Sequence, residues 1–178
     1  LITGVAGTGK SLLLRRIKYE LQRKQKNIAV VAPTGIAAIN IGGATINSFC
    51  GIGIPKKASD FRKMLHGKRR KELEKSDVWI IDEVSMLSGE MLDCVDTYMQ
   101  QIRKNRKPFG GVQLILCGDF LQLPPVPSQI PESIDDLKEA KKADVLFLNR
   151  GFAFQAKCWP RFQVKMIKLH TVHRQGGD

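Results

Sequence analysis

Short apolar runs alternate with longer amphipathic stretches along the chain. The longest unbroken apolar runs are Ile28–Ala32, Val78–Ile81, Leu114–Cys117 and Val145–Leu148. We expect the first three to be strands buried on both faces, because short continuous apolar runs are typical of the interior of a parallel sheet. Val164–Leu169 alternates weakly and is a candidate for a late strand. None of these runs approaches the roughly 20 residues that a transmembrane helix needs.

Two stretches between the runs have the spacing of helices. In Lys10–Lys24 the apolar residues that recur at helical intervals are Leu12, Leu13, Ile17 and Leu21. In Met91–Arg106 one face collects Met91, Val95, Met99 and Ile102. The next residues, Pro108–Gly111, predict a turn into the following strand. Strands that alternate with helices predict an α/β fold, in which helices cover both faces of a parallel sheet.

Composition fits a globular domain and adds one feature, an excess of positive charge. The 178 residues are 43% hydrophobic and 26% charged, which excludes wholesale disorder. Lys and Arg number 29 against 17 Asp and Glu, so the net charge of +12 indicates a polyanionic partner without identifying it. The four cysteines form no C-x-x-C pair, which argues against a zinc ribbon or a disulfide scaffold and favours a reducing, intracellular compartment.

Two stretches and the two ends lack a regular pattern. Ser59–Lys75 is helix-prone and strongly basic, and Pro124–Asp136 is rich in proline. We expect the second stretch to begin a stiff loop or small insertion over residues 124–150. The chain starts without Met, directly before a glycine-rich motif, and closes on Gln175–Asp178 without a terminal element. We therefore expect a piece of a longer protein, from whose start no signal peptide can be read.

The glycine-rich motif carries the clearest chemistry. Gly4–Ser11 fits G-x-x-x-x-G-K-[ST] between a strand and a helix, which makes an accidental glycine turn the weaker interpretation. Glycines let backbone N–H groups turn toward phosphate oxygens, and the next helix adds its positive end. We expect Lys10 to reach the β- and γ-phosphates of ATP and Ser11 to hold Mg²⁺. The candidate nucleotide contacts of the loop are Gly4, Ala6, Gly7, Thr8, Gly9, Lys10 and Ser11.

Two adjacent carboxylates follow the apolar run Val78–Ile81. Asp82, at the end of the strand, is expected to bind Mg²⁺ through its water shell, and Glu83 to polarise the water that attacks the γ-phosphate. Acidic residues often simply end strands, so this pair alone is weak support. Beside a phosphate loop it favours an NTPase over a small-molecule kinase, because a kinase needs no water-activating Glu at this position.

Polar residues after the later strands extend the candidate site. Gln122 is placed to touch the γ-phosphate, although a Gly-Asp turn before a proline loop gives the same spacing. Arg174 follows the last candidate strand and is in isolation an ordinary exposed arginine. His170 and His173 have no Cys or His partner nearby, so we interpret them as surface histidines rather than as a metal pair.

Taken together, these segments resemble the petite-integration-frequency (Pif) family of superfamily-1 DNA helicases. The motifs that carry the resemblance follow the family's order through nearly the whole chain, and they are Gly4–Ser11, Ala32–Ala38, Gly42–Phe49, Ile81–Met86, Pro108–Leu114 and Gly118–Val126. The Pro-Phe-Gly-Gly stretch is specific to this family and its close relatives, which include helicase regions of some rolling-circle transposons.

The resemblance implies a RecA-like P-loop NTPase fold and an ATP-driven helicase that moves 5′ to 3′ on single-stranded DNA in genome maintenance. Residues 1–178 would be the first RecA-like domain of a monomeric protein, whose second RecA-like domain lies beyond the chain. In a eukaryote such a protein would lie in the nucleus or the mitochondrion. A lone first domain should bind nucleotide weakly and unwind nothing.

The resemblance also implies roles for single residues. Lys10, Ser11, Asp82 and Glu83 keep the roles given above, Gln122 becomes the γ-phosphate sensor, and Arg174 becomes an arginine finger. The candidate single-strand contacts are Thr34, Gly35, Thr45, Asn47, Ser48 and Phe49. Their hydroxyls and backbone N–H groups suit phosphate oxygens, and Phe49 would either stack on a base or pack inside.

Two departures and two rival functions stand beside this hypothesis. The family usually has His where Asn47 stands, and a hydrophobic-aromatic pair where Val172 and His173 stand. A phosphotransferase acting on a small molecule is one rival. The other is a nucleic-acid-binding module without turnover, against which the intact set of Lys10, Ser11, Asp82, Glu83 and Gln122 argues.

Half of the excess charge falls in one segment. Pro55–Lys75 holds nine basic and three acidic residues, a net of 9 − 3 = +6. In the sequence it lies between the candidate single-strand loops and Asp82. It is therefore either a border of the DNA path or a solvated basic face.

Overall fold

The protein is described from a computed structural model that covers residues 1–52, 68–125 and 151–172. All strand pairs in it are parallel, and they form one four-stranded sheet in the order β3-β2-β4-β5 and one pair, β1-β6. A parallel bridge between Ile2 and Cys117 joins the pair to the β5 side of the sheet. The strands are β1 Ile2–Thr3, β2 Ile28–Ala32, β3 Ala44–Thr45, β4 Val78–Ile81, β5 Gln113–Leu116 and β6 Ile167–Lys168.

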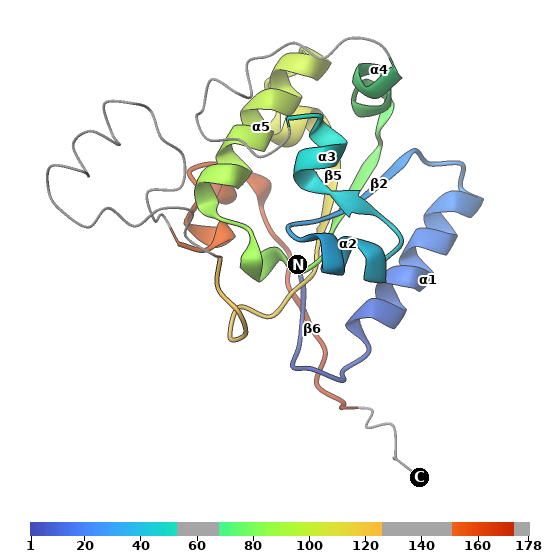
Figure 1. Ribbon diagram of the computed structural model, residues 1–178, viewed down its shortest axis with the longest axis vertical. Coiled ribbons are helices and arrows are strands. Elements are labelled where there is room, and N and C mark those ends of the chain that lie inside the picture. The colour runs from blue at the N-terminus through green and yellow to red at the C-terminus, as the bar shows by residue number, and fades with distance from the viewer. Residues whose placement is uncertain (53–67, 126–150, 173–178) are drawn as a thin grey trace, which may run out of the picture.

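Helices cover both faces of this sheet, as the alternating pattern predicted (Figure 1). The α-helices are α1 Lys10–Arg23, α2 Gly35–Asn40, α3 Ile46–Cys50, α4 Lys68–Lys75 and α5 Gly89–Arg103. Short 3₁₀ turns follow β4 at Val84–Met86, precede β5 at Pro108–Gly111, and form the Ala153–Gln155 and Trp159–Phe162 segments. The α1 helix lies on one face of the sheet and α5 on the other (Figure 1).

Strand β4 shows why two helix layers form. All four of its residues are buried, and successive side chains of a strand point to opposite faces. Val78 and Ile80 pack in the cluster that contains Leu14 of α1. Trp79 and Ile81 pack in the larger cluster that contains most of the apolar face of α5. A strand that is apolar on both faces thus requires a helix on each.

The helix and strand bounds differ slightly from the prediction, for local reasons. Helix α5 begins at Gly89, because the Ser88 hydroxyl accepts a hydrogen bond from Met91 N at 3.2 Å and caps it. It ends at Arg103, where Lys104 takes a left-handed conformation with φ 50°. Strand β5 is shifted by one residue relative to Leu114–Cys117, and of the late strand only Ile167–Lys168 pairs.

The turn at Pro108–Gly111 is part of the core rather than a surface breaker. Phe109 is 1% exposed, with φ 51°, and its ring meets Trp79 edge-on at 5.2 Å. The buried carboxylate of Asp96 on α5 accepts a hydrogen bond from Phe109 N at 2.5 Å. The turn is therefore fixed to α5 before the chain enters β5.

The structure also describes the cysteines, the helix lengths and the clusters of possible metal ligands. All four cysteines are free. In the described ranges no helix is long and apolar enough to span a bilayer, and no cluster of three or more His, Cys, Asp or Glu side chains could hold a metal ion. The Val145–Leu148 run, and the candidate insertion apart from its first two residues, lie outside the described residues.

Candidate active site

The phosphate loop connects β1 to α1 and has a sharply curled backbone. Gly7 and Gly9 take left-handed conformations with φ 79° and 83°, which only glycine adopts at little cost. The Thr8 hydroxyl donates a hydrogen bond to the Val5 carbonyl at 2.8 Å and closes the curl. Ala6 and Gly7 are exposed at its tip. The loop thus presents its backbone at the surface, directly before the N-terminus of a 14-residue helix.

Lys10 and Ser11 open that helix. The Lys10 ammonium donates hydrogen bonds to the carbonyls of Gly4 at 2.7 Å and Val5 at 3.1 Å, so its charge lies over the loop. Ser11 is exposed at the next position. A cation and a hydroxyl therefore flank the curled backbone, as the sequence motif predicted.

The two carboxylates at the end of β4 differ in their surroundings. Asp82 is 6% exposed, and its Oδ1 accepts a hydrogen bond from Glu83 N at 2.9 Å. Glu83 is half-buried and turns the chain with φ 51°. Burial raises the pKa of Glu83, the charges of Asp82 and Asp119 raise it further, and Lys10 opposes them. These charges act on one another because the phosphate loop and the strand ends meet at one edge of the sheet.

Asp119 is the site residue that the sequence interpretation missed. It is 6% exposed at the end of the segment that follows β5. Its Oδ2 accepts a hydrogen bond from the Gln122 side-chain amide at 2.9 Å, and its Oδ1 accepts one from Leu121 N at 3.1 Å. In the sequence alone, a Gly-Asp turn is an alternative explanation for the spacing of Gln122. The two interpretations are compatible, because the Asp119 carboxylate in the turn orients the side-chain amide of Gln122.

The position of Asp119 also had a signal in the sequence. It follows a buried strand that is the immediate neighbour of the Asp82 strand, and the carboxyl ends of parallel strands meet at one edge. Gly118, which precedes it, donates a backbone hydrogen bond to Ile2 at 3.1 Å. A Cβ at Gly118 would lie 3.0 Å from Val84 N. The segments of Asp82 and Asp119 are thus packed backbone to backbone.

The candidate single-strand residues lie at the same edge, after β2 and from the last residue of β3 onward. The Thr34 hydroxyl accepts a hydrogen bond from Ala37 N at 3.3 Å, and the Thr45 hydroxyl accepts one from Ser48 N at 3.1 Å. Each threonine therefore caps a short helix, α2 or α3, that hydrophobic periodicity did not reveal. A capping oxygen accepts a hydrogen bond, which leaves its O–H free to donate to a phosphate oxygen. Gly35 and Ser48 are exposed beside these two caps, and Asn47 is half-buried.

Phe49 takes the packed alternative of the two that the sequence left open. Its ring meets Trp79 edge-on at 5.2 Å, and it packs against the larger core cluster. The side chain is half-buried and also lines a hollow at the surface, so a contact of Phe49 with DNA stays a prediction. Arg174 and His173 lie outside the described residues, and His170 is exposed.

Comparisons with known proteins agree with this geometry. The family model described as PIF1-like helicase matches residues 1–178. The ATP-dependent DNA helicase PIF1 of Saccharomyces cerevisiae (strain YJM789) is 44% identical over 99% of this chain. That alignment covers 19% of the yeast protein, so the chain spans about a fifth of the length of this relative.

Solved structures give the same result for the fold. The crystal structure of Pif1 helicase from Candida albicans matches 99% of this chain and 37% of its own, with a TM-score of 0.77 and 39% identity. The structure of Pif1 helicase from Bacteroides in complex with ADP-AlF3 and single-stranded DNA matches 99% of this chain and 39% of its own, with a TM-score of 0.75 and 34% identity. The predicted RecA-like parallel sheet is thereby confirmed.

Proposed function

Because the chain belongs to the PIF1-like helicase family, we propose that it is the first RecA-like motor domain of an ATP-dependent DNA helicase. The helicase moves 5′ to 3′ on single-stranded DNA and serves genome maintenance, including repair and recombination, inside the cell. The observation that carries this proposal is the meeting of four groups at one edge of the sheet, namely Lys10, Asp82, Glu83 and the Asp119–Gln122 pair. Such a set suits hydrolysis of a nucleoside triphosphate rather than transfer to a small molecule.

The phosphate loop binds the nucleotide. The N-terminus of α1 and the Lys10 ammonium attract the β- and γ-phosphates. The Lys10 ammonium is bonded to the carbonyls of Gly4 and Val5, which keeps its charge beside the loop. The related Bacteroides helicase has been solved with ADP-AlF3. Nucleotide binding by this chain is the natural extension of that finding.

Mg²⁺ is the metal that fits this site. The Ser11 hydroxyl and the Asp82 carboxylate supply oxygen ligands, which Mg²⁺ prefers, and one or two protein ligands suffice when phosphates and water complete the shell. When bound between these two side chains, the ion would neutralise charge on the β- and γ-phosphates. Asp82 is held by Glu83 N, so its carboxylate is oriented in advance.

Glu83 and Gln122 act on the γ-phosphate side. Glu83 accepts the proton of the attacking water, and its raised pKa brings it closer to the pH at which a general base is most effective. Gln122, held by Asp119, contacts the γ-phosphate and senses its loss. Arg174 is proposed as the arginine finger from the family resemblance alone.

The second partner is single-stranded DNA at the same edge. Thr34 and Thr45 offer hydroxyl donors, and the exposed Gly35 and Ser48 stand beside them with Asn47. The related Bacteroides structure contains single-stranded DNA. A second RecA-like domain, in the part of the longer protein beyond this chain, would close the nucleotide site and complete the strand-binding surface of a monomeric motor.

The test is ATP hydrolysis by the full-length protein with and without a single-stranded oligonucleotide. A motor couples the two ligands, so the rate should rise steeply when the oligonucleotide is added. A rate that ignores DNA would overturn the helicase proposal and favour the small-molecule phosphotransferase. Strand separation by residues 1–178 alone would contradict the requirement for a second domain.

A further inference from the structure

The edge of the sheet opposite the candidate active site carries a concentration of positive charge. Three segments enter the sheet there, residues 23–27 before β2, 69–77 before β4 and 103–107 before the turn that leads to β5. We call these three segments together the amino-edge surface. They contain eleven Lys and Arg and three Asp and Glu, a net charge of 11 − 3 = +8.

Hydrogen bonds between the strand entries bring the three segments together. Asn27 N donates to Asp77 Oδ2 at 2.8 Å, and Asp77 N donates to the Asn27 carbonyl at 2.8 Å. The Arg103 guanidinium donates to the Ser76 carbonyl at 2.9 Å and so joins the third segment to the second. Segments whose bonded residues are 50 and 27 residues apart in sequence thus become neighbours. This clustering could not be read from the charge of any one segment.

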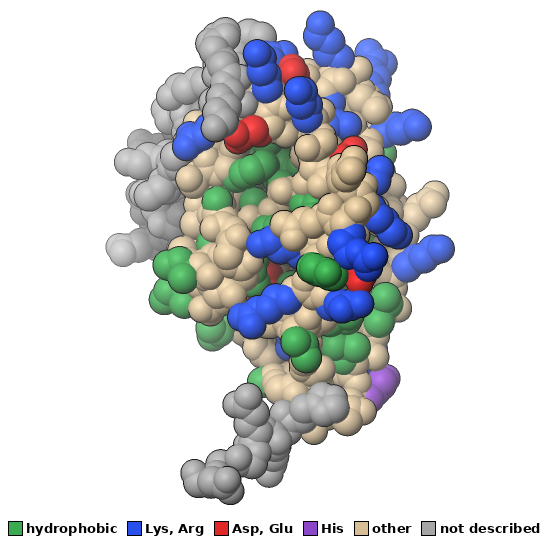
Figure 2. Space-filling view, turned by 90° about the vertical axis from the view of Figure 1, so that its right-hand side faces the viewer, with side chains coloured by type: hydrophobic (Ala, Val, Ile, Leu, Met, Phe, Trp, Pro, Cys, Tyr) green, Lys and Arg blue, Asp and Glu red, His purple; other side chains and the backbone are tan. Residues whose placement is uncertain are grey.

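Most of these cations are available to a partner. Arg23 pairs with Glu20, Arg70 pairs with Glu74, and Arg103 is bonded to backbone carbonyls. The other eight of the eleven are exposed and form no ion pair with another described side chain. Figure 2 shows Lys and Arg side chains standing out at the upper end of the molecule, where α4 lies in Figure 1. The excess charge is therefore presented to solvent rather than neutralised within the domain.

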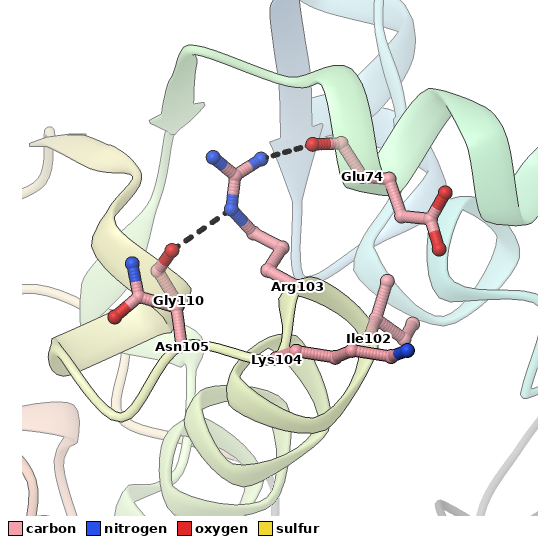
Figure 3. Close-up of a pocket in the computed structure, with 6 residues that line it drawn as sticks. All are labelled: Glu74, Ile102, Arg103, Lys104, Asn105 and Gly110. Carbon is pink, nitrogen blue, oxygen red and sulfur yellow. Dashed lines mark hydrogen bonds between the residues drawn. The ribbon is translucent and has the colours of Figure 1, made fainter.

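Two hollows lie within this surface. One has a volume of about 390 Å³ and is lined by Glu74, Ile102, Arg103, Lys104, Asn105 and Gly110 (Figure 3). The other has a volume of about 360 Å³, and its lining includes Asn27, Lys71, Lys75, the carboxylate of Glu72 and the half-buried Phe49. Ammonium and amide groups at a hollow offer hydrogen-bond donors to a phosphate group. The surface thus has concave places as well as charge.

The composition of the surface favours double-stranded DNA over a single strand. The three segments read RKQKN, RRKELEKSD and RKNRK, without an aromatic side chain. The one aromatic residue that lines either hollow is Phe49, and its ring packs edge-on against Trp79. Single-strand sites typically add aromatic rings on which bases stack, whereas duplex binding of low specificity rests on phosphate contacts alone. Because β4 has four residues, this surface is about 13 Å or more from the candidate active site, at 3.3 Å per residue.

We propose that the amino-edge surface binds the phosphate backbone of double-stranded DNA. This contact is separate from the proposed single-strand path and needs no nucleotide. Duplex DNA would lie against the amino edge of the sheet, while the single strand binds at the carboxyl edge. The described part of the basic stretch 55–75 belongs to this surface, because α4 directly precedes the residues that enter β4 at the amino edge.

The test is the salt dependence of duplex binding by the full-length protein without nucleotide. A variant with Lys26→Gln, Lys75→Gln and Lys107→Gln removes one exposed cation from each segment. Each lost phosphate contact lowers the slope of log K against log salt by about one unit, so the triple variant should lose about two to three units on a blunt 16-base-pair duplex. Binding of a 16-nucleotide single strand should keep its slope.

Lys157→Gln is the matched control. Lys157 is exposed, and its backbone N–H is bound by Asp93, ten residues before the end of α5 and about 15 Å along that helix from Arg103. This variant should leave the salt slope of duplex binding unchanged.

The proposal would be overturned if the triple variant kept the salt slope of duplex binding, or if the salt slope of single-strand binding fell equally. A loss of affinity for polyglutamate but not for the duplex would overturn it too, in favour of an acidic protein partner. None of these outcomes depends on ATP turnover, so the test stands even if the proposed function fails.

Discussion

At the carboxyl edge of the sheet polar side chains are fixed by hydrogen bonds, whereas at the amino edge most of them extend into solvent. Asp82 and Asp119 are each 6% exposed and each accepts hydrogen bonds from neighbouring residues. Lys26, Lys75 and Lys107 are exposed. Chemistry at a reacting phosphate requires groups placed within fractions of an ångström. Attraction of a polyanion requires only net charge, which many side chains share.

This difference predicts opposite outcomes for the same loss of one charge. Glu83→Gln at the carboxyl edge should lower kcat for ATP hydrolysis by about 10²–10⁴-fold, since an amide cannot accept the proton of the attacking water. Nucleotide binding should be retained, because Lys10 and the phosphate loop are untouched. Steady-state hydrolysis and nucleotide titration of the full-length protein measure the two quantities.

Lys26→Gln at the amino edge is the counterpart, because it also removes one charge, of the opposite sign. It should leave hydrolysis in the absence of DNA unchanged. Equal losses of kcat in the two variants would contradict this comparison, in which exact placement matters at the carboxyl edge and net charge matters at the amino edge. Unchanged turnover in Glu83→Gln would remove Glu83 from its role.

Arg103 is a cation at the amino edge whose side chain is fixed by hydrogen bonds, as the polar groups at the carboxyl edge are. Its guanidinium donates to the carbonyls of Gly110 at 2.8 Å and Ser76 at 2.9 Å and also to that of Glu74, so it ties the end of α4 to the turn before β5 (Figure 3). Arg103→Ala leaves these carbonyls without their charged donor. It should lower the free energy of unfolding by about 2–4 kcal/mol, measured by urea denaturation.

Lys104→Ala is the control, because the exposed Lys104 is the next residue and carries the same charge. It should change stability by no more than about 0.5 kcal/mol. Similar losses in both variants would mean that Arg103 acts through charge alone and that its carbonyl contacts contribute little.

Two glycines beside β2 test how tightly this part of the sheet is packed, since Gly43 directly precedes β3 and Gly35 follows β2. A Cβ at Gly43 would contact the Val30 carbonyl, with its carbon at 2.8 Å, so Gly43→Ala must push β3 away from β2. We expect a loss of about 1–3 kcal/mol in the free energy of unfolding. Gly35→Ala meets nothing within 4 Å and begins α2, so it should be neutral or add up to about 1 kcal/mol. Thermal or urea unfolding of the two variants should separate them.

The sequence predicted those features of the molecule that depend on local pattern. Continuous apolar runs identified β2 and β4, helical spacing identified α1 and α5, and the spelling of Gly4–Ser11 identified the phosphate loop. The short helices α2 and α3 escaped, since six and five residues are too few to show a helical period.

The features that the sequence does not predict depend on how the strands and helices are arranged in space. The sequence predicts a turn at Phe109, but only the contact of its ring with Trp79 and the hydrogen bond from its N–H to Asp96 place it in the core. The amino-edge surface likewise needs the strand order, since the Asn27–Asp77 bonds join segments that are remote in sequence. Charge can be counted from the chain, but its clustering cannot.

The smallest expected effect at the carboxyl edge is a shift in the pH dependence of kcat, caused by the charges around Glu83. Glu83 must be ionised to accept a proton, so kcat falls as the pH drops through its pKa. The pKa of Glu83 is raised by burial, then by Asp82, and also by Asp119, which places this acidic limb at a higher pH than an ordinary Glu would give. Asp119→Asn removes one negative charge near Glu83. The pKa of Glu83 should then fall, and the acidic limb of the pH–rate profile should move to lower pH.

Glu20→Gln is the matched control, since it removes one negative charge from the exposed surface of α1, where Glu20 pairs with Arg16. Its acidic limb should coincide with that of the unsubstituted protein. An Asp119→Asn limb that stays in place or moves to higher pH would show that Asp119 does not act on Glu83 through its charge. The plateau of kcat at higher pH distinguishes a change in the pKa of Glu83 from a loss of the hydrogen bond that positions Gln122. Loss of the Asp119–Gln122 geometry would lower the plateau at every pH, whereas loss of the charge moves only the limb.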